Sequence, residues 1–210
     1  MNIRTVVFDI GGVLIDWNPR YLYRKILKDD FRTIEYFLEN VCNYDWNAQQ
    51  DAGRTYRAGV SQLKKQHPQY ADLIEAYDKR WEEMLGDVNR ETLAILKQLK
   101  RANMPLYALT NWSAEKFPIA RKRYNFFNLF DDIFVSGEIG VKKPDLEFYR
   151  LFLTEFNIKA DEALFIDDLI TNIEAANQVG MNTIHFIDAQ QLKKSLNDFG
   201  LLLHLTQIMQ

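Results

Sequence analysis

Short apolar segments alternate with amphipathic segments along most of the chain. Five segments are continuously apolar and rich in β-branched or aromatic residues: 5–8, 105–109, 133–135, 163–166 and 183–186. Strands that are buried on both faces have this composition, so the pattern predicts a parallel sheet that is covered by helices. Apolar residues at helical spacing predict helices at 90–102, 114–124, 146–156 and 170–179.

One interval breaks this alternation. Between residues 17 and 86 the spacing is helical, and no segment has the composition of a strand. Helices are predicted there at 21–27, 33–41, 60–65 and 71–85. The sequence therefore predicts an α/β fold, a Rossmann-like parallel sheet sandwiched by helices, with an inserted all-helical cap domain. The predicted core comprises 1–16 and 87–210, and the predicted cap comprises 17–86.

Composition narrows the possible functions. The 210 residues include 26 Lys and Arg against 29 Asp and Glu, a formal charge of -3, so nothing favours binding to nucleic acid. No apolar run is long enough to span a membrane, and the N-terminal segment lacks the pattern of a signal peptide. The single cysteine, Cys42, cannot form an internal disulfide. We therefore expect a cytoplasmic monomer or homodimer without a nucleic-acid or membrane partner.

Polar side chains follow three of the predicted strands. They are Asp9 after the first strand, Thr110 and Asn111 after the second, and Asp167 and Asp168 after the fourth. Each alone fits a helix cap or a turn residue equally well. Together they favour a site, because the carboxyl ends of parallel strands meet at one edge of a sheet. Oxygen ligands of this kind, with Lys143 nearby, suit Mg²⁺ and a phosphate group.

Four motifs, in order along the chain, resemble those of the haloacid dehalogenase (HAD) superfamily of phosphohydrolases. They lie at 8–16 (FDIGGVLID), at 109–111 (LTN), at 140–145 (GVKKPD) with Phe148, and at 165–168 (FIDD) with Asn172. The predicted helical insertion falls where the first type of cap domain of that family belongs. Residues 46–53 are also similar to the cap of a subgroup that includes α-D-glucose-1-phosphate phosphatase.

The resemblance implies that Asp9 is a nucleophile. Attack of its carboxylate on phosphorus would form an aspartyl-phosphate, which divides one difficult displacement into two easier ones. Mg²⁺ would be held by Asp9, Asp167 and Asp168. The backbone carbonyl of Gly11 would be a further ligand, because that contact needs no side chain.

The resemblance also assigns residues to the transferred phosphoryl group. Thr110 and Asn111 would donate hydrogen bonds to its oxygens, and Lys143 would pair with the group and with Asp9 as a point charge. The implied function is Mg²⁺-dependent hydrolysis of a phosphomonoester. The expected substrate is a small phosphorylated metabolite, in particular a sugar phosphate.

Gly11 departs from the family pattern, which places a second Asp, the general acid and base, two residues after the nucleophile. General acid catalysis contributes about 10²–10⁴-fold, so its loss would slow departure of an ordinary alcohol. Asp16 or a cap residue can donate the proton instead. Alternatively, the leaving group is a weak base, such as the anomeric oxygen of a sugar 1-phosphate or the carboxylate of an acyl phosphate.

Three residues of the insertion are candidates for contact with the substrate. Trp17, Trp46 and Arg54 suit a sugar phosphate, since aromatic faces bind sugar rings and Arg binds phosphate. Packing where the cap meets the core is the alternative for both Trp residues.

Three other functions remain open from the sequence. A 2-haloacid dehalogenase would not need the acidic pair at 167–168, and dehalogenases of this family place Tyr where Gly11 stands. A phosphomutase usually retains the second Asp. A protein that binds a phosphorylated ligand without turnover is the non-catalytic alternative.

Overall fold

The computed structural model describes residues 2–202. Its central feature is a sheet of five parallel strands in the order β5-β4-β1-β6-β7. The strands are β1 (Thr5–Phe8), β4 (Leu106–Thr110), β5 (Asp132–Val135), β6 (Ala163–Asp167) and β7 (Asn182–His185). In the centre of the sheet, Val7 pairs with Tyr107 on one side and with Phe165 on the other. All five strands predicted from the sequence are confirmed.

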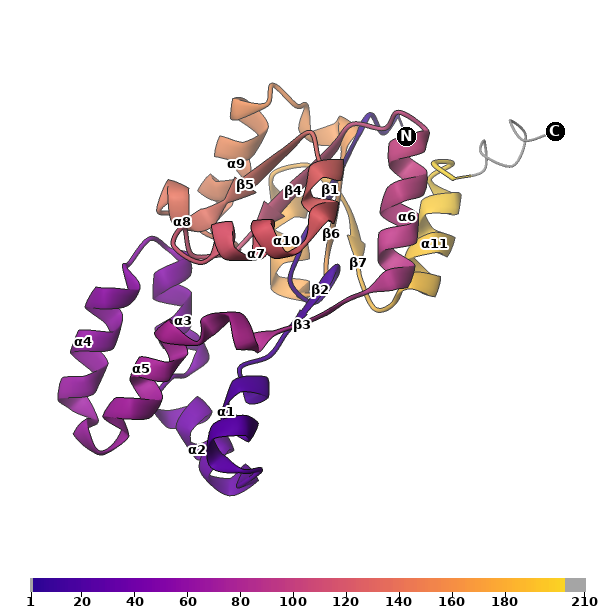
Figure 1. Cartoon of the computed structure of the whole chain (residues 1–210). Helices are drawn as coiled ribbons and strands as arrows, with labels where there is room; N and C mark the ends of the chain where they lie inside the picture. The colour runs from indigo at the N-terminus through magenta and orange to yellow at the C-terminus, as the bar shows by residue number, and fades with distance from the viewer. Residues whose placement is uncertain (1, 203–210) are drawn as a thin grey trace.

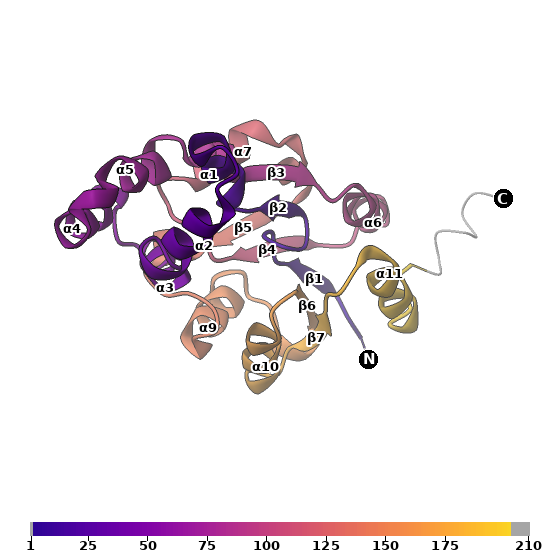
Figure 2. The ribbon, with the colours of Figure 1, turned by 90° about the horizontal axis from the view of Figure 1, so that it is seen from below.

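Helices cover both faces of this sheet, as expected (Figure 2). They are α6 (Arg90–Arg101), α7 (Phe117–Arg123), the short α8 (Ser136–Ile139), α9 (Leu146–Glu155), α10 (Ile170–Gln178) and α11 (Ala189–Asp198). Val6 and Phe8 of β1 belong to an apolar cluster that includes side chains of α6, α7 and α11. Val7, between them, belongs to a second cluster with α9 and α10, because successive side chains of a strand point to opposite faces.

The insertion after β1 forms a separate group of helices beside the carboxyl edge of the sheet (Figure 1). It contains α1 (Arg20–Leu27), α2 (Phe31–Asn40), α3 (Tyr44–Asp51), α4 (Tyr56–Gln66) and α5 (Ala71–Lys79), with 3₁₀ turns at Pro68–Tyr70 and Trp81–Met84. Helix α3 was not predicted. Its N-cap residue is Asn43, whose side chain accepts a hydrogen bond from the backbone N–H of Trp46.

A short antiparallel ribbon joins the insertion to the core. It pairs β2 (Ile15–Trp17) with β3 (Leu85–Val88). The expectation that the interval contains no strand was therefore wrong at both of its ends. Strands of three and four residues, one of which contains Gly86 and Asp87, are too short to show a strand pattern. We keep the predicted division, core 1–16 and 87–210 with cap 17–86, as a proposal; its residues 203–210 lie outside those described.

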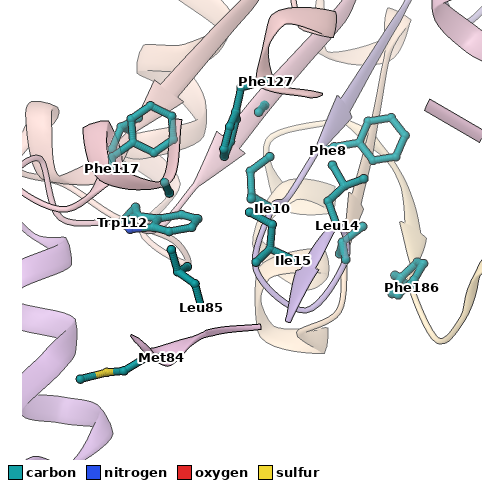
Figure 3. Close-up of a cluster of buried hydrophobic side chains, with 14 of the residues drawn as sticks. Phe8, Ile10, Leu14, Ile15, Met84, Leu85, Trp112, Phe117, Phe127 and Phe186 are labelled. Carbon is teal, nitrogen blue, oxygen red and sulfur yellow. The ribbon is translucent and has the colours of Figure 1, made fainter. Parts of the chain in front are cut away.

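Apolar packing is continuous from the sheet through the ribbon (Figure 3). Phe8 and Ile10 pack in the same buried cluster as Ile15 of β2 and Leu85 of β3. Cap residues such as Phe37 belong to this cluster too. The base of the cap is therefore held by the same apolar core as the sheet. Within residues 2–202, no helix has the length and apolar character needed to cross a membrane.

Candidate active site

Three carboxylates meet at the carboxyl edge of the sheet. Asp9 directly follows β1, Asp167 ends the adjacent strand β6, and Asp168 directly follows it. Because the two strands are neighbours and parallel, their ends lie side by side. One carboxylate oxygen from each of the three residues lies within 4.8 Å of the others.

Lys143 is the cation of this cluster. Its Nζ lies 2.9 Å from Oδ1 of Asp9 and 2.7 Å from Oδ2 of Asp167, and its side chain is 1% exposed. Burial alone would lower the pKa of Lys143, but the carboxylates of Asp167 and Asp9 raise it above its ordinary value. The ammonium therefore stays charged between two carboxylates.

Asn111 holds the backbone of Lys143 in place. Its Nδ2 donates to the carbonyl oxygen of Lys143 at 2.9 Å, and its Oδ1 accepts from the N–H of Lys143 at 2.8 Å. Both ends of the Asn111 amide thus bind the peptide backbone, and the second N–H of Nδ2 remains for the predicted contact with phosphate, which stays a prediction. Thr110, one residue earlier, is buried at the end of β4, next to β1.

Asp167 is fully engaged by protein donors. Its Oδ1 accepts from the N–H of Leu169 at 2.8 Å and from Nδ2 of Asn172 at 3.0 Å. Its Oδ2 accepts from Asn172 at 3.1 Å and from Lys143 at 2.7 Å. Asp167 is therefore a fixed anion that orients Lys143, whereas no side chain of the described residues hydrogen-bonds to the carboxylate of Asp168.

The charges of the cluster do not balance. Burial, with the charges of Asp167 and Asp168, raises the pKa of Asp9 to about 7 against the lowering effect of Lys143. Burial and the charge of Asp167 also raise the pKa of Asp168. One ammonium thus faces three carboxylates, and the excess negative charge with oxygen donors fits a divalent cation such as Mg²⁺.

Two adjacent glycines shape the space around these carboxylates. Gly12 has a φ of 73°, and a Cβ placed there would lie 2.3 Å from Oδ2 of Asp168. A side chain at Gly12 would therefore displace Asp168. A Cβ at Gly11 would meet no atom within 4 Å, and the Gly11 carbonyl accepts no hydrogen bond from the described residues. This carbonyl is free to face a cation.

Asp16, the residue considered as a proton donor, is not part of the carboxylate cluster. Its carboxylate accepts a hydrogen bond from the hydroxyl of Tyr21. It also lies against Gly86, since a Cβ at Gly86 would be 2.9 Å from Oδ2 of Asp16. Trp17, the next residue, is half-buried, and its indole Nε1 has no hydrogen-bond partner among the described residues.

The contacts that Trp46 and Arg54 make are with other residues of the cap. Trp46 is buried and packs edge-on against Tyr56 and Tyr77, so its packing lies within the cap rather than where the cap meets the core. The guanidinium of Arg54 lies over the Trp46 ring and donates to the Trp46 carbonyl at 3.0 Å. It also donates to the amide oxygen of Gln50 at 2.6 Å, and it lines a cap cavity of ≈ 320 Å³.

Another part of the cap contacts the segments that follow β4 and β5. The hydroxyl of Ser136, which follows β5, donates to the backbone carbonyl of Asp51 at 2.5 Å. The carboxylate of Glu115, in the loop after β4, accepts from the N–H of Tyr56 at 3.0 Å. Asp51 was not among the sequence candidates, although it lies inside the segment that resembles a known cap.

The chain belongs to the haloacid dehalogenase-like hydrolase family, whose model matches residues 3–180. Two similar proteins are phosphatases by name. The sesquiterpene phosphatase astK of Aspergillus oryzae is 33% identical over 89% of this chain and 91% of its own length. A phosphorylated carbohydrates phosphatase of Thermotoga maritima is 25% identical over 96% of this chain and 90% of its own length.

The fold is also that of solved HAD enzymes. A magnesium complex of a HAD family enzyme from Bacteroides thetaiotaomicron superposes with a TM-score of 0.69. The match covers 90% of this chain and 95% of that chain, at 22% identity.

Proposed function

We propose that the protein is a Mg²⁺-dependent phosphatase that hydrolyses a small phosphomonoester through an aspartyl-phosphate on Asp9. The observation that carries this proposal is the cluster of Asp9, Asp167 and Asp168 around a single buried lysine, Lys143. Two similar proteins named as phosphatases support the phosphatase activity.

Each residue of the cluster has a distinct role in this proposal. The carboxylate of Asp9 attacks phosphorus, and Lys143 favours the ionised form of that carboxylate and attracts the anionic phosphoryl group. Asn111 is a positioning residue, because it holds the backbone of Lys143. Thr110 has the hydroxyl that would donate to a phosphoryl oxygen.

The residues that would hold Mg²⁺ are Asp9, Asp168 and the carbonyl of Gly11. When bound, the ion supplies positive charge that lets the anionic nucleophile approach an anionic phosphate. The oxygens of Asp167 are already engaged by Lys143, Asn172 and a backbone N–H. In this proposal, Asp167 therefore positions Lys143.

The substrate in this proposal is a sugar phosphate. Gly11 supplies no carboxyl group to protonate the leaving oxygen, so a weakly basic leaving group, such as the anomeric oxygen of a sugar 1-phosphate, suits the site best. The relative named for phosphorylated carbohydrates supports this class of substrate, whereas the relative named for sesquiterpenes acts on a different one.

Turnover of p-nitrophenyl phosphate with and without Mg²⁺ tests the proposal. Its phenolate leaves readily without a proton, so the wild type is expected to hydrolyse it with Mg²⁺ and to lose the activity in EDTA. The Asp9→Asn variant is expected to be inactive. No turnover by the wild type under any metal condition would favour a non-catalytic binding protein, and metal-free release of chloride from chloroacetate would favour a dehalogenase.

A further inference from the structure

A cavity of ≈ 320 Å³ lies within the cap, lined by residues of α3, of α4 and of the end of α2. Its volume is at the lower end of the range for small-molecule sites, about 300–1,000 Å³. None of its lining residues belongs to the carboxylate cluster at the edge of the sheet. The cavity is therefore separate from the proposed phosphatase site and large enough for a small metabolite.

The guanidinium of Arg54 is the cation of this cavity. It lies over the ring of Trp46, 5.6 Å from the ring centroid, and donates to the Trp46 carbonyl at 3.0 Å. Its other hydrogen bonds go to side-chain amide oxygens of Gln50 at 2.6 Å, Gln49 at 2.6 Å and Gln62 at 3.4 Å. All of these acceptors are uncharged. In the described part of the chain, ion pairs within 4.0 Å join other arginines to carboxylates but do not include Arg54.

Asp45 supplies the opposite charge at the same cavity. It is exposed in the first turn of α3, and within residues 2–202 its carboxylate forms no ion pair and accepts no hydrogen bond. A carboxylate in a first turn also interacts favourably with the helix dipole, so Asp45 alone would not indicate a ligand. Together, Arg54 and Asp45 place two opposite charges on one cavity without pairing them. A ligand that carries both charges would neutralise both residues.

The rest of the polar lining consists of side chains that can donate and accept hydrogen bonds. They are Asn40, Asn43, Gln49, Gln62, Gln66 and His67. A carboxamide offers two donors and one acceptor oxygen, so this lining suits hydroxyl and amide groups. It favours a polar ligand over an apolar one.

A ligand carboxylate would improve the contacts of Arg54. Burial lowers the pKa of Arg54, so its surroundings oppose the charge of the guanidinium. Hydrogen bonds from a guanidinium to a carboxylate are charge-assisted and stronger than those to a neutral amide. Gln62 is exposed and is the most distant of the present acceptors, so a ligand carboxylate can take its place.

We propose that this cap cavity binds a small zwitterion of the amino-acid class, with its carboxylate at Arg54 and its ammonium at Asp45. The polar lining favours an amino acid whose side chain carries an amide or a hydroxyl group. The inference goes beyond the proposed phosphatase function and does not depend on it, because this binding needs neither Mg²⁺ nor Asp9.

Isothermal titration calorimetry in EDTA tests the proposal, with free asparagine, glutamine, serine and threonine as the probes. Wild type is expected to bind at least one of them with one site per chain, and Asp9→Asn is expected to bind it equally well. Two analogues of the best probe separate its charges: one lacks the ammonium group, and in the other the carboxylate is an amide. Each analogue is expected to bind about 10–100-fold more weakly, the range for a lost hydrogen bond to a charged group.

Two variants assign the charges to residues. Arg54→Gln is expected to weaken binding of the best probe by about 10–100-fold. Asp45→Asn is expected to remove the preference for the probe over the analogue without the ammonium, and it serves if Arg54→Gln does not fold, because Asp45 is exposed. Arg57→Gln is the matched control, since Arg57 is an exposed arginine of α4 that does not line this cavity. It is expected to leave binding unchanged.

The proposal is overturned if no probe binds at millimolar concentration, or if the analogue without the ammonium binds as tightly as the amino acid. Unchanged binding by both Arg54→Gln and Asp45→Asn would overturn it as well. Loss of binding in Asp9→Asn would place the probe at the phosphatase site instead. Failure of the proposed function is a different result, in which wild type binds the probe but hydrolyses no p-nitrophenyl phosphate with Mg²⁺.

Discussion

The ammonium of Lys143 lies 2.9 Å from Oδ1 of Asp9, and both side chains are buried. This contact influences the protonation state of the proposed nucleophile, Asp9. Burial alone would keep the Asp9 carboxyl group protonated near neutral pH, and Lys143 acts against that tendency. Asn111, the residue after β4, holds the backbone of Lys143, the residue whose ammonium faces Asp9.

Replacement of Lys143 by Met is expected to lower kcat for p-nitrophenyl phosphate by at least about 10²–10³-fold, because one group that stabilises the phosphoryl charge is lost. It also leaves two buried carboxylates without their cation, which costs about 3–5 kcal/mol of unfolding free energy. Steady-state kinetics and urea denaturation measure the two effects.

The matched control for stability is Lys159→Met. The ion pair of Lys159 with Glu162 is exposed at the lysine, so the control is expected to change little. Equal stability losses in the two variants would contradict the role given to burial.

Substitutions at the adjacent residues Gly11 and Gly12 are expected to change activity in opposite directions. Gly12→Ala forces a side chain against Asp168 at a φ of 73°, so it is expected to weaken Mg²⁺ binding and activity together. Gly11→Asp enters open space and restores a carboxyl group, so it is expected to raise turnover of alkyl phosphates with basic leaving groups.

Calorimetric titration with Mg²⁺ and kinetics on p-nitrophenyl and alkyl phosphates measure the effects of the two substitutions. A Gly12→Ala variant with unchanged Mg²⁺ affinity would contradict the close approach to Asp168. A Gly11→Asp variant that gains nothing on alkyl phosphates would show that the wild type already has a proton donor.

Asp51 gives the folded protein a pH dependence of stability. Its pKa is about 7 in the folded protein against an ordinary value of 3.8, so between these values the folded state holds a proton that the unfolded state has lost. Unfolding free energy therefore falls as pH rises from about 4 to about 7. Asp51→Asn removes this contribution and is expected to lose less stability than wild type between pH 5 and pH 8, as measured by thermal unfolding.

The sheet and the strand-end residues could be predicted from the sequence because their signals are local. Buried strands such as 163–166 are continuously apolar, and the polar residues that end them must share an edge in a parallel sheet. The sequence pattern therefore predicts that Asp9 and Asp167 lie close together, although it does not contain the contacts that each of them makes.

Other features depend on contacts that no local pattern contains. Helix α3 lacks an apolar stripe, because polar residues such as Asn47 and Gln50 are partly or fully buried through hydrogen bonds. The role of Asn111 depends on a backbone 32 residues away. Trp46 and Asp51 lie on one helix, but only the structure shows that Trp46 packs inside the cap while the backbone carbonyl of Asp51 contacts the core.

The most direct test of the account is acid quenching of the enzyme during turnover of a ³²P-labelled substrate, followed by proteolysis and peptide mapping. We expect an acid-stable, hydroxylamine-sensitive label on the peptide that contains Asp9, formed with Mg²⁺ and absent from Asp9→Asn. Turnover with the label on another residue, or hydrolysis that persists in Asp9→Asn, would contradict the central claim.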